Sequence, residues 1–326
     1  MAAETEPAAA ASGGIAGEME VEAYRRLFPL AFLERHLGES VRPDARRLAE
    51  ARTTTVALGA VTSAHGSALI RLGDTAMLAS IKLEVMSPLA ESPDEGSLAV
   101  EFHMPPICSP LVRPGRPAEA TPVISKALED FWDVKFEGTL FDQWESFLDI
   151  YCLNADGSLF DAALISSVAA FTHLEIPLVS VGDDGRVFTV GGNEGKTKFE
   201  LVNREKRKLT LGDIPFSLTC ALHKDSVLAD PTSEEESIIE TSVTVVVDSS
   251  DRLVSIQKLG GTVVSMATIK ECISLAKERR RKLREILTDC VEAMESSMLV
   301  VCLVPDKEFA ENMVSSLQRT ENDLSL

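Results

Sequence analysis

The spacing of apolar residues predicts a helical N-terminal region. Between Val21 and Phe28 the apolar side chains recur three or four residues apart, so they share one face of a helix that starts at residue 20. Pro29 interrupts the pattern because proline lacks the backbone N–H that a helix interior requires. The same spacing resumes over residues 31–37 and ends at Gly38.

The period then changes to that of strands. β-Branched and alternating runs predict an antiparallel meander, with strand segments at 52–58, 60–63, 68–72 and 77–85. Residues 86–123 are rich in proline and serine and predict a long loop, with one further strand within 98–104. After the loop the pattern predicts a helix, a strand and a buried helix at 124–132, 147–153 and 158–174, the last ended by Pro177.

The second half shows the same order of elements. Strands are predicted at 216–222, 226–228, 238–247 and 253–259. Gly260 and Gly261 lead into a long helix whose apolar residues alternate in steps of three and four from Met266 to Met294, with Arg280 in one of these positions. Because strands precede a helix in both halves, the sequence predicts an α+β duplication with a long C-terminal helix, and not a doubly wound sheet.

The ends of the chain differ from its centre. Residues 1–20 contain Ala, Gly and Glu without periodicity, which predicts disorder, and no basic start or apolar centre of a targeting segment is present. We therefore expect a disordered segment at 1–20, a first domain with its N-terminal helix at 21–200, a second domain at 201–298 and a tail at 299–326. The longest apolar run, Met298 to Val304, is far shorter than the ~20 residues of a membrane helix, so no membrane association is expected.

Charge and cysteine content narrow the function classes. The chain has 32 Lys and Arg against 51 Asp and Glu, a net charge of −19, so any RNA contact needs a local basic patch or a basic partner. The six cysteines form no CxxC pair and have no histidine at ligand spacing. We expect reduced cysteines, no structural metal and no cofactor.

Several motifs have both a functional and a structural interpretation. Residues 191–197 (GGNEGKT) lack the spacing of a phosphate-binding loop, which favours a β-turn. The acidic run at 234–236, with Asp230 and Glu240, could hold Mg²⁺, but a solvated loop and strand start are favoured. None of the five histidines forms a nucleophile–base pattern, and His173 is expected to pack or cap at a helix end.

Three basic clusters are candidates for RNA contacts. The cluster at 277–284 lies on the long helix and is interpreted as a solvated helix face. The cluster at 204–208 either follows RNA phosphates or is a solvated segment. Arg113 and Arg116, separated by Pro114 and Gly115 in the long loop, indicate RNA binding more strongly, because two guanidiniums on one loop can bind backbone phosphates. They are the predicted RNA-binding residues, with a solvated loop as the alternative.

Five stretches of the sequence together resemble the RNase PH-type proteins, and those of the second half resemble the non-catalytic branch of the exosome ring subunits. They are VRPDAR at 41–46, RTTT at 52–55, GSALIRLGDT at 66–75, LADPT at 228–232 with EEE at 234–236, and KLGG at 258–261. The resemblance spans Tyr24 to Met294. It implies two RNase PH-like βαβα halves in a six-membered ring over an RNA channel. It also implies other ring subunits, cap proteins and RNA as partners, and a location in nucleus, nucleolus and cytoplasm.

The resemblance also bears on catalysis. Active relatives follow the Ala-Asp-Gly turn with Gly-Thr/Ser-Arg, whereas the turn at 155–157 is followed here by Ser-Leu-Phe. Active members carry arginines before the helix at 124, where this chain has Ala-Thr-Pro at 120–122, and their catalytic aspartate region corresponds loosely to 240–241. No catalytic residue is therefore predicted.

The resemblance thus implies a non-catalytic exosome ring subunit that supports 3′-to-5′ RNA processing and degradation, including maturation of ribosomal RNA, and lines the RNA channel. One alternative is a phosphorolytic 3′-to-5′ exoribonuclease whose site a neighbouring subunit completes, motivated by Asp230 and Glu240. The other is an adaptor with this fold that never touches RNA, motivated by the charge of −19.

Overall fold

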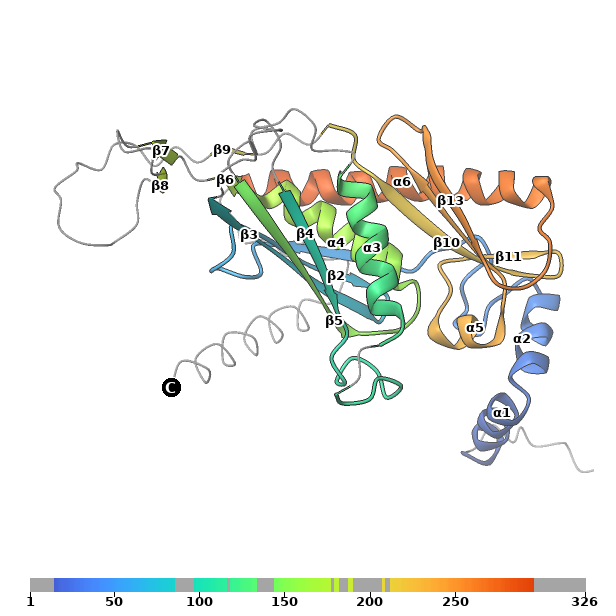
Figure 1. The fold of residues 1–326 in the computed structure, drawn as a ribbon. Helices are drawn as coiled ribbons and strands as arrows, with labels where there is room; N and C mark the ends of the chain where they lie inside the picture. Colours follow the sequence, from blue (N-terminus) through green and yellow to red (C-terminus); the bar gives the residue numbers. More distant parts are fainter. Residues whose placement is uncertain are drawn as a thin grey trace, which may run out of the picture.

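The computed structural model describes residues 15–85, 97–115, 118–133, 144–176, 179–181, 187–189, 207–208 and 212–295 (Figure 1). These residues form two mixed α/β parts, each with its own main sheet, and a long helix that packs against both. No helix in these ranges has the length and apolar character needed to cross a lipid bilayer.

The first sheet has five strands in the order β1-β2-β3-β5-β4. They are β1 (Thr54–Leu58), β2 (Gly66–Leu72), β3 (Thr75–Val85), β4 (Ser97–His103) and β5 (Trp144–Asn154). The pairs from β1 to β3 and between β3 and β5 are antiparallel, whereas β4 runs parallel to β5. Two helices accompany this sheet, α3 (Ala120–Asp133) and α4 (Leu159–His173).

Helix α4 is buried on nearly every side because it packs between the two sheets. It contacts β2 and β3 of the first sheet and β10 of the second, and its residues from Asp161 to Phe171 are all buried. An apolar helix without a polar face is typical of such a central position. The two predicted domains therefore share one apolar core across α4.

The second sheet has four antiparallel strands in the order β11-β10-β12-β13. They are β10 (Phe216–His223), β11 (Ser226–Ala229), β12 (Ser242–Val247) and β13 (Leu253–Leu259), with helices α5 (Ser233–Ile238) and α6 (Met266–Glu295). Helix α6 lies against β1 as well as β10 and β12, so it links the two sheets (Figure 1). Leu283 and Leu287 are among its buried residues.

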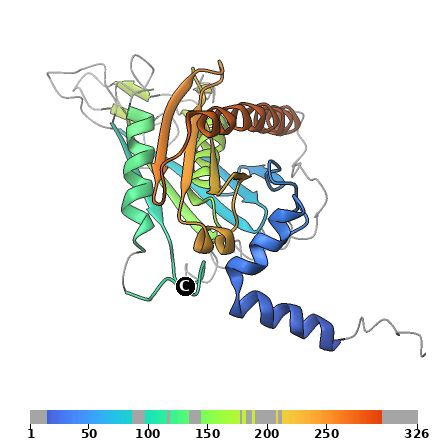
Figure 2. The same cartoon turned by 90° about the vertical axis from the view of Figure 1, so that its right-hand side faces the viewer.

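The N-terminal helices α1 (Ile15–Leu27) and α2 (Pro29–Gly38) lie at one side of the molecule (Figure 2). Pro29 occupies the first turn of α2, where its missing N–H costs nothing. Leu33 fixes α2 through a small cluster with Ala221, Leu228 and Ile239. The remaining short strands form two pairs, β6 (Glu175–Ile176) with β9 (Arg207–Lys208) and β7 (Val179–Val181) with β8 (Val187–Thr189).

The predicted α+β duplication is confirmed, and β13 has the predicted bounds. Three local expectations are corrected. Residues 60–63 form no strand, since β2 begins at Gly66, and residues 238–241 precede β12 because α5 occupies 233–238. Disorder at 15–20 is also wrong, because Ala, Glu and Met at these positions favour the first turns of α1. Residues 1–14, Pro177 and residues 299–326 lie outside the described residues, and the other domain boundaries stay predictions.

Candidate functional site at the junction of the two sheets

Arg52, just before β1, binds Asp230, which follows β11. Its Nε lies 2.9 Å from Oδ2 and its Nη2 lies 2.7 Å from Oδ1, and the backbone N–H of Arg52 also donates to Oδ2 at 2.8 Å. Nη1 of Arg52 faces Oδ2 of Asp156 at 3.2 Å, in the turn before α4. One guanidinium therefore ties together β1, the turn before α4 and the second sheet.

Arg42 forms a second buried ion pair beside the first. Its Nε donates to Oε1 of Glu235 at 2.8 Å, and its other nitrogens donate to the carbonyl oxygens of Ala229 at 2.6 Å and Asp230 at 3.0 Å. Glu235 also completes a capping box at the start of α5, because Thr232 N–H donates to its Oε2 at 2.9 Å. Both buried charges are thus paired. Pairing and hydrogen bonding offset the free-energy cost of removing two charged groups from water.

The N-terminus of α4 is closed by a carboxylate of the chain itself. Ser158, at the N-cap, has a left-handed backbone with φ 49°, and its N–H donates to Oε1 of Glu236 at 2.8 Å. Glu236 is exposed along part of its length, but its carboxylate points to the helix end. The N–H groups of a helix N-terminus attract anions such as phosphate, and here the carboxyl group of Glu236 takes that position.

Three carboxyl groups in this region have shifted pKa values. Burial opposes ionisation of Asp230, yet the hydrogen bonds and charge of Arg52 outweigh it and hold the pKa of Asp230 below its usual range. Burial raises the pKa of Asp161 to about 6 and that of Glu236 to about 7. The junction therefore has a firmly ionised carboxylate next to two that retain protons more readily.

Little space remains between these groups. A cavity of about 10 Å³ lies among Thr54, Asp161, Ser217, Asp230 and Arg279. A cavity of this size holds about one water molecule, not a nucleotide. The half-buried Arg279 donates to Oγ1 of Thr54, and the loss of solvent around its guanidinium lowers its pKa.

The carboxylates of the predicted acidic cluster do not share one metal site, because those described below each face a different partner. Glu234 pairs with Arg25, while Glu235, Glu236 and Asp230 face Arg42, Ser158 N–H and Arg52 respectively. The expectation of a loop and strand start is wrong, because residues 233–238 form α5. The expected solvation holds in part, because Glu234 is exposed whereas Glu235 is 3% exposed. The roles of Arg42 and Arg52 as structural cations were not predicted, and no local pattern indicates them. The start of α5 does have a local signal, the capping box Thr-x-x-Glu at 232–235.

The predicted RNA-binding loop starts beside the same junction. Arg113 is exposed in the segment between β4 and α3, and Arg116 lies outside the described residues. The base of the loop is fixed, because Ala155 N–H donates to the carbonyl oxygen of buried Cys108 at 3.0 Å. Arg113 thus extends from a loop attached to the turn before α4, but it is not part of the ion-pair network described above.

The remaining sequence predictions have mixed outcomes. The five described cysteines are free and buried, as expected, and Cys302 lies outside the described residues, as do residues 191–197. Nδ1 of His173 accepts from Ser67 N–H at 3.1 Å, which is the expected packing role. The solvated face predicted at 277–284 holds only in part, because Arg280 is buried and pairs with Asp251 at 3.0 Å, and Arg279 is half-buried.

Comparison with known proteins covers both parts of the chain. The model of the 3′ exoribonuclease family, domain 1, matches residues 50–177, and that of domain 2 matches residues 213–279. The exosome complex component Rrp42 of Methanopyrus kandleri is 32% identical over 270 residues, covering 78% of this chain and 96% of that protein. The exosome complex component rrp43 of Schizosaccharomyces pombe is 29% identical over 264 residues, covering 78% and 94%.

A solved structure agrees with these sequence matches. A chain of the Archaeoglobus fulgidus exosome with RNA bound to the active site superposes with a TM-score of 0.65 and 27% sequence identity. The match covers 82% of the present chain and 98% of that chain. The similarity therefore extends over both sheets and the helices between them.

Proposed function

The chain belongs to the 3′ exoribonuclease (RNase PH) family, and we propose that it is a non-catalytic structural subunit of an exosome ring. In this role it supports 3′-to-5′ RNA processing and degradation, including maturation of ribosomal RNA. Its partners are other RNase PH-like ring subunits, cap proteins and RNA, and it works in nucleus, nucleolus and cytoplasm. The relatives named as exosome components support the assembly because the matches include both sheets.

The observation that carries the non-catalytic assignment is the carboxylate of Glu236 on the N-terminus of α4. Phosphorolysis needs cationic groups that hold inorganic phosphate and the RNA backbone. Here the carboxyl group of Glu236 already accepts the N–H at the helix end that would bind phosphate, and Ser158 is followed by Leu159 and Phe160, not by an arginine. Arg52 cannot substitute, since Asp230 and Asp156 occupy its guanidinium.

The residues that motivated an enzymatic alternative do not favour it. Asp230 is 1% exposed and binds Arg52, so it has no free face toward an RNA strand. Glu240 is exposed, and no described arginine or lysine forms an ion pair with it. A site completed by a neighbouring subunit would have to supply the phosphate-binding cations itself.

A reconstituted complex tests the proposal. The chain is assembled with its ring partners, whose own catalytic residues are inactivated, and release of nucleoside diphosphates from single-stranded RNA is measured with and without inorganic phosphate. We expect no phosphate-dependent release. Release that disappears with Glu240→Ala would establish the enzymatic alternative.

The assembly itself is tested separately. Native mass spectrometry of the tagged chain, purified from its own cells, should detect a complex with other RNase PH-like subunits. A lone monomer or homodimer would contradict the ring assignment, whatever the result of the phosphorolysis assay.

A further inference from the structure

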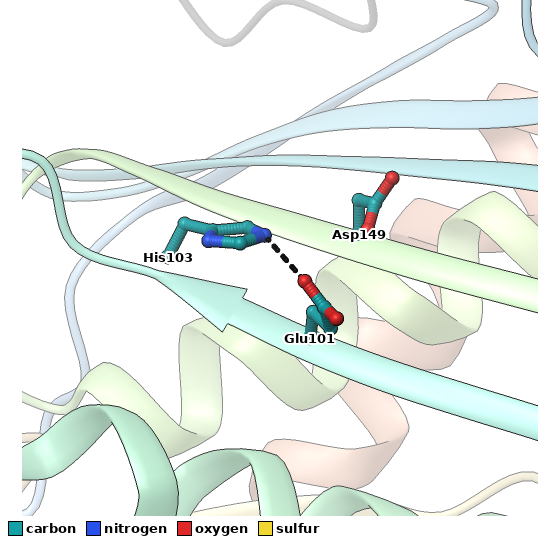
Figure 3. Close-up of side chains that lie close together, drawn as sticks. All are labelled: Glu101, His103 and Asp149. Carbon is teal, nitrogen blue, oxygen red and sulfur yellow. Dashed lines mark ion pairs between the residues drawn. The ribbon is translucent and has the colours of Figure 1, made fainter.

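A group of three metal-ligating side chains lies on β4 and β5, outside the junction described above (Figure 3). Glu101 and Asp149 are direct register partners in the parallel pair, and His103 follows Glu101 on the same face of β4. The intervening residues Phe102 and Ile150 point into the core. The three polar side chains therefore lie on the face of the sheet opposite the core.

The hydrogen-bonded strands hold these side chains close together. One ligand atom from each residue lies within 4.8 Å of the other two, and Nε2 of His103 lies 3.3 Å from Oε2 of Glu101. The ring of His103 stacks on Tyr151 with centroids 4.6 Å apart and planes at 21°. This stacking restricts the imidazole so that its Nε2 faces the carboxylates (Figure 3).

The charges at this place are unbalanced. Like charges directly opposite on adjacent strands destabilise a sheet, and Glu101 and Asp149 are such a pair. Among the described residues no lysine or arginine forms an ion pair with either carboxylate, and on β3 the residue opposite Asp149 is Ser80. A cation held between the two carboxylates and the imidazole would remove the repulsion.

We propose that Glu101, His103 and Asp149 bind a divalent transition-metal ion, with Zn²⁺ as the best match. The set offers one imidazole nitrogen and one oxygen from each of two carboxylates, and three protein ligands of these types with water in the fourth position suit Zn²⁺. Mg²⁺ fits less well because it prefers oxygen ligands in octahedral geometry. The ion would join β4 to β5 and stabilise the folded chain in proportion to its occupancy.

Metal binding to the full chain tests this inference. The protein is treated with a chelator, and Zn²⁺ binding is measured by equilibrium dialysis for His103→Gln, Glu101→Gln and Asp149→Asn. All proteins, including the reference, carry Cys302→Ser, so that this thiol cannot bind Zn²⁺. The other five cysteines are buried and are left unchanged. His223→Gln is the matched control: His223 pairs with Glu34 at 3.0 Å, but Lys224 stands there in place of a second carboxylate.

The reference protein should bind one Zn²⁺ per chain at this site. Loss of a second-shell partner of a metal ligand weakens affinity by about 10–100-fold, so each ligand substitution should weaken it by at least about tenfold. His223→Gln should bind as the reference does. In the NMR spectrum Mn²⁺ should broaden the imidazole signal of His103 before those of the other four histidines.

Absence of Zn²⁺ binding would overturn the inference, as would equal affinity in the reference protein and the three ligand variants. Circular dichroism establishes that each variant is folded. If one of them does not fold, the other two still decide the question, since each removes a different donor. The outcome does not depend on the exosome assignment.

Discussion

Arg52 and Asp230 form a two-point ion pair that joins the two sheets across 178 residues of sequence. Asp230 has a left-handed backbone with φ 52°, which turns its carboxylate toward Arg52 and its carbonyl oxygen toward Arg42. Both charged groups are almost fully buried. The junction is therefore held by paired charges as well as by the apolar core around α4.

Asp230→Asn should destabilise the protein strongly. The substitution removes the negative charge and leaves the guanidinium of Arg52 buried with an incomplete partner, and breaking a buried pair in this way costs about 3–5 kcal/mol. Urea unfolding followed by circular dichroism measures the loss. Asp74→Asn is the matched control, because Asp74 is exposed in its pair with Arg71 and should cost less than about 1 kcal/mol. Equal losses in the two variants would contradict the structural role of Asp230.

Asp161→Asn should change the pH dependence of stability. The pKa of Asp161 is raised to about 6 in the folded protein, from 3.8, so its contribution is fully present below pH 3.8 and is lost as the pH rises through about 6. Relative to the variant, the wild type should lose up to about 3 kcal/mol between pH 4 and pH 8. Unfolding curves across this range measure the difference, which includes a smaller contribution from Glu236, because the charge of Asp161 also raises the pKa of Glu236. Parallel curves would show that Asp161 is ionised throughout.

Gly157→Ala should disrupt the turn before α4. Gly157 has φ +76°, and an added Cβ would lie 2.5 Å from the carbonyl oxygen of Pro231. Gly115→Ala is the control, since Gly115 has φ +78° but none of the described residues has an atom within 4 Å of such a Cβ. Both variants share a backbone strain of about 1–2 kcal/mol, and the clash should add about 1–3 kcal/mol for Gly157 alone. Thermal unfolding that ranks the two equally would mean that Pro231 moves away freely.

Periodic elements were predictable because their pattern is local. Strand β13 and helix α6 follow from alternation and from three- and four-residue spacing, and Arg280 does occupy an apolar position on α6. Helix α5 was missed because it is too short for periodicity to be visible, although its capping box at Thr232 and Glu235 was a usable signal. The parallel pairing of β4 with β5 depends on tertiary contacts and has no local signature.

The candidate sites were less predictable for the same reason. Arg42 and Glu235 are 193 residues apart, so neither residue type nor spacing indicates that they pair. The two strand-borne carboxylates at Glu101 and Asp149 become neighbours only through the register of β4 and β5. Sequence composition correctly indicated that basic groups are scarce, but not that the junction uses several of them for internal ion pairs.

Arg113→Glu should weaken RNA binding by the assembled complex. Arg113 is exposed on a loop whose base is fixed by the Ala155–Cys108 hydrogen bond, so its guanidinium can contact a backbone phosphate without a change of fold. Removing one phosphate contact should lower the slope of log K against log salt by about 1 for all RNA sequences. Fluorescence anisotropy at several salt concentrations measures both the affinity for RNA and the slope.

Arg281→Glu is the control for Arg113→Glu, because it makes the same charge change at an exposed residue of α6. Equal effects of the two substitutions would mean that only total charge matters, and the adaptor without RNA contacts would then be favoured. A loss confined to Arg113 would assign the loop to the RNA path.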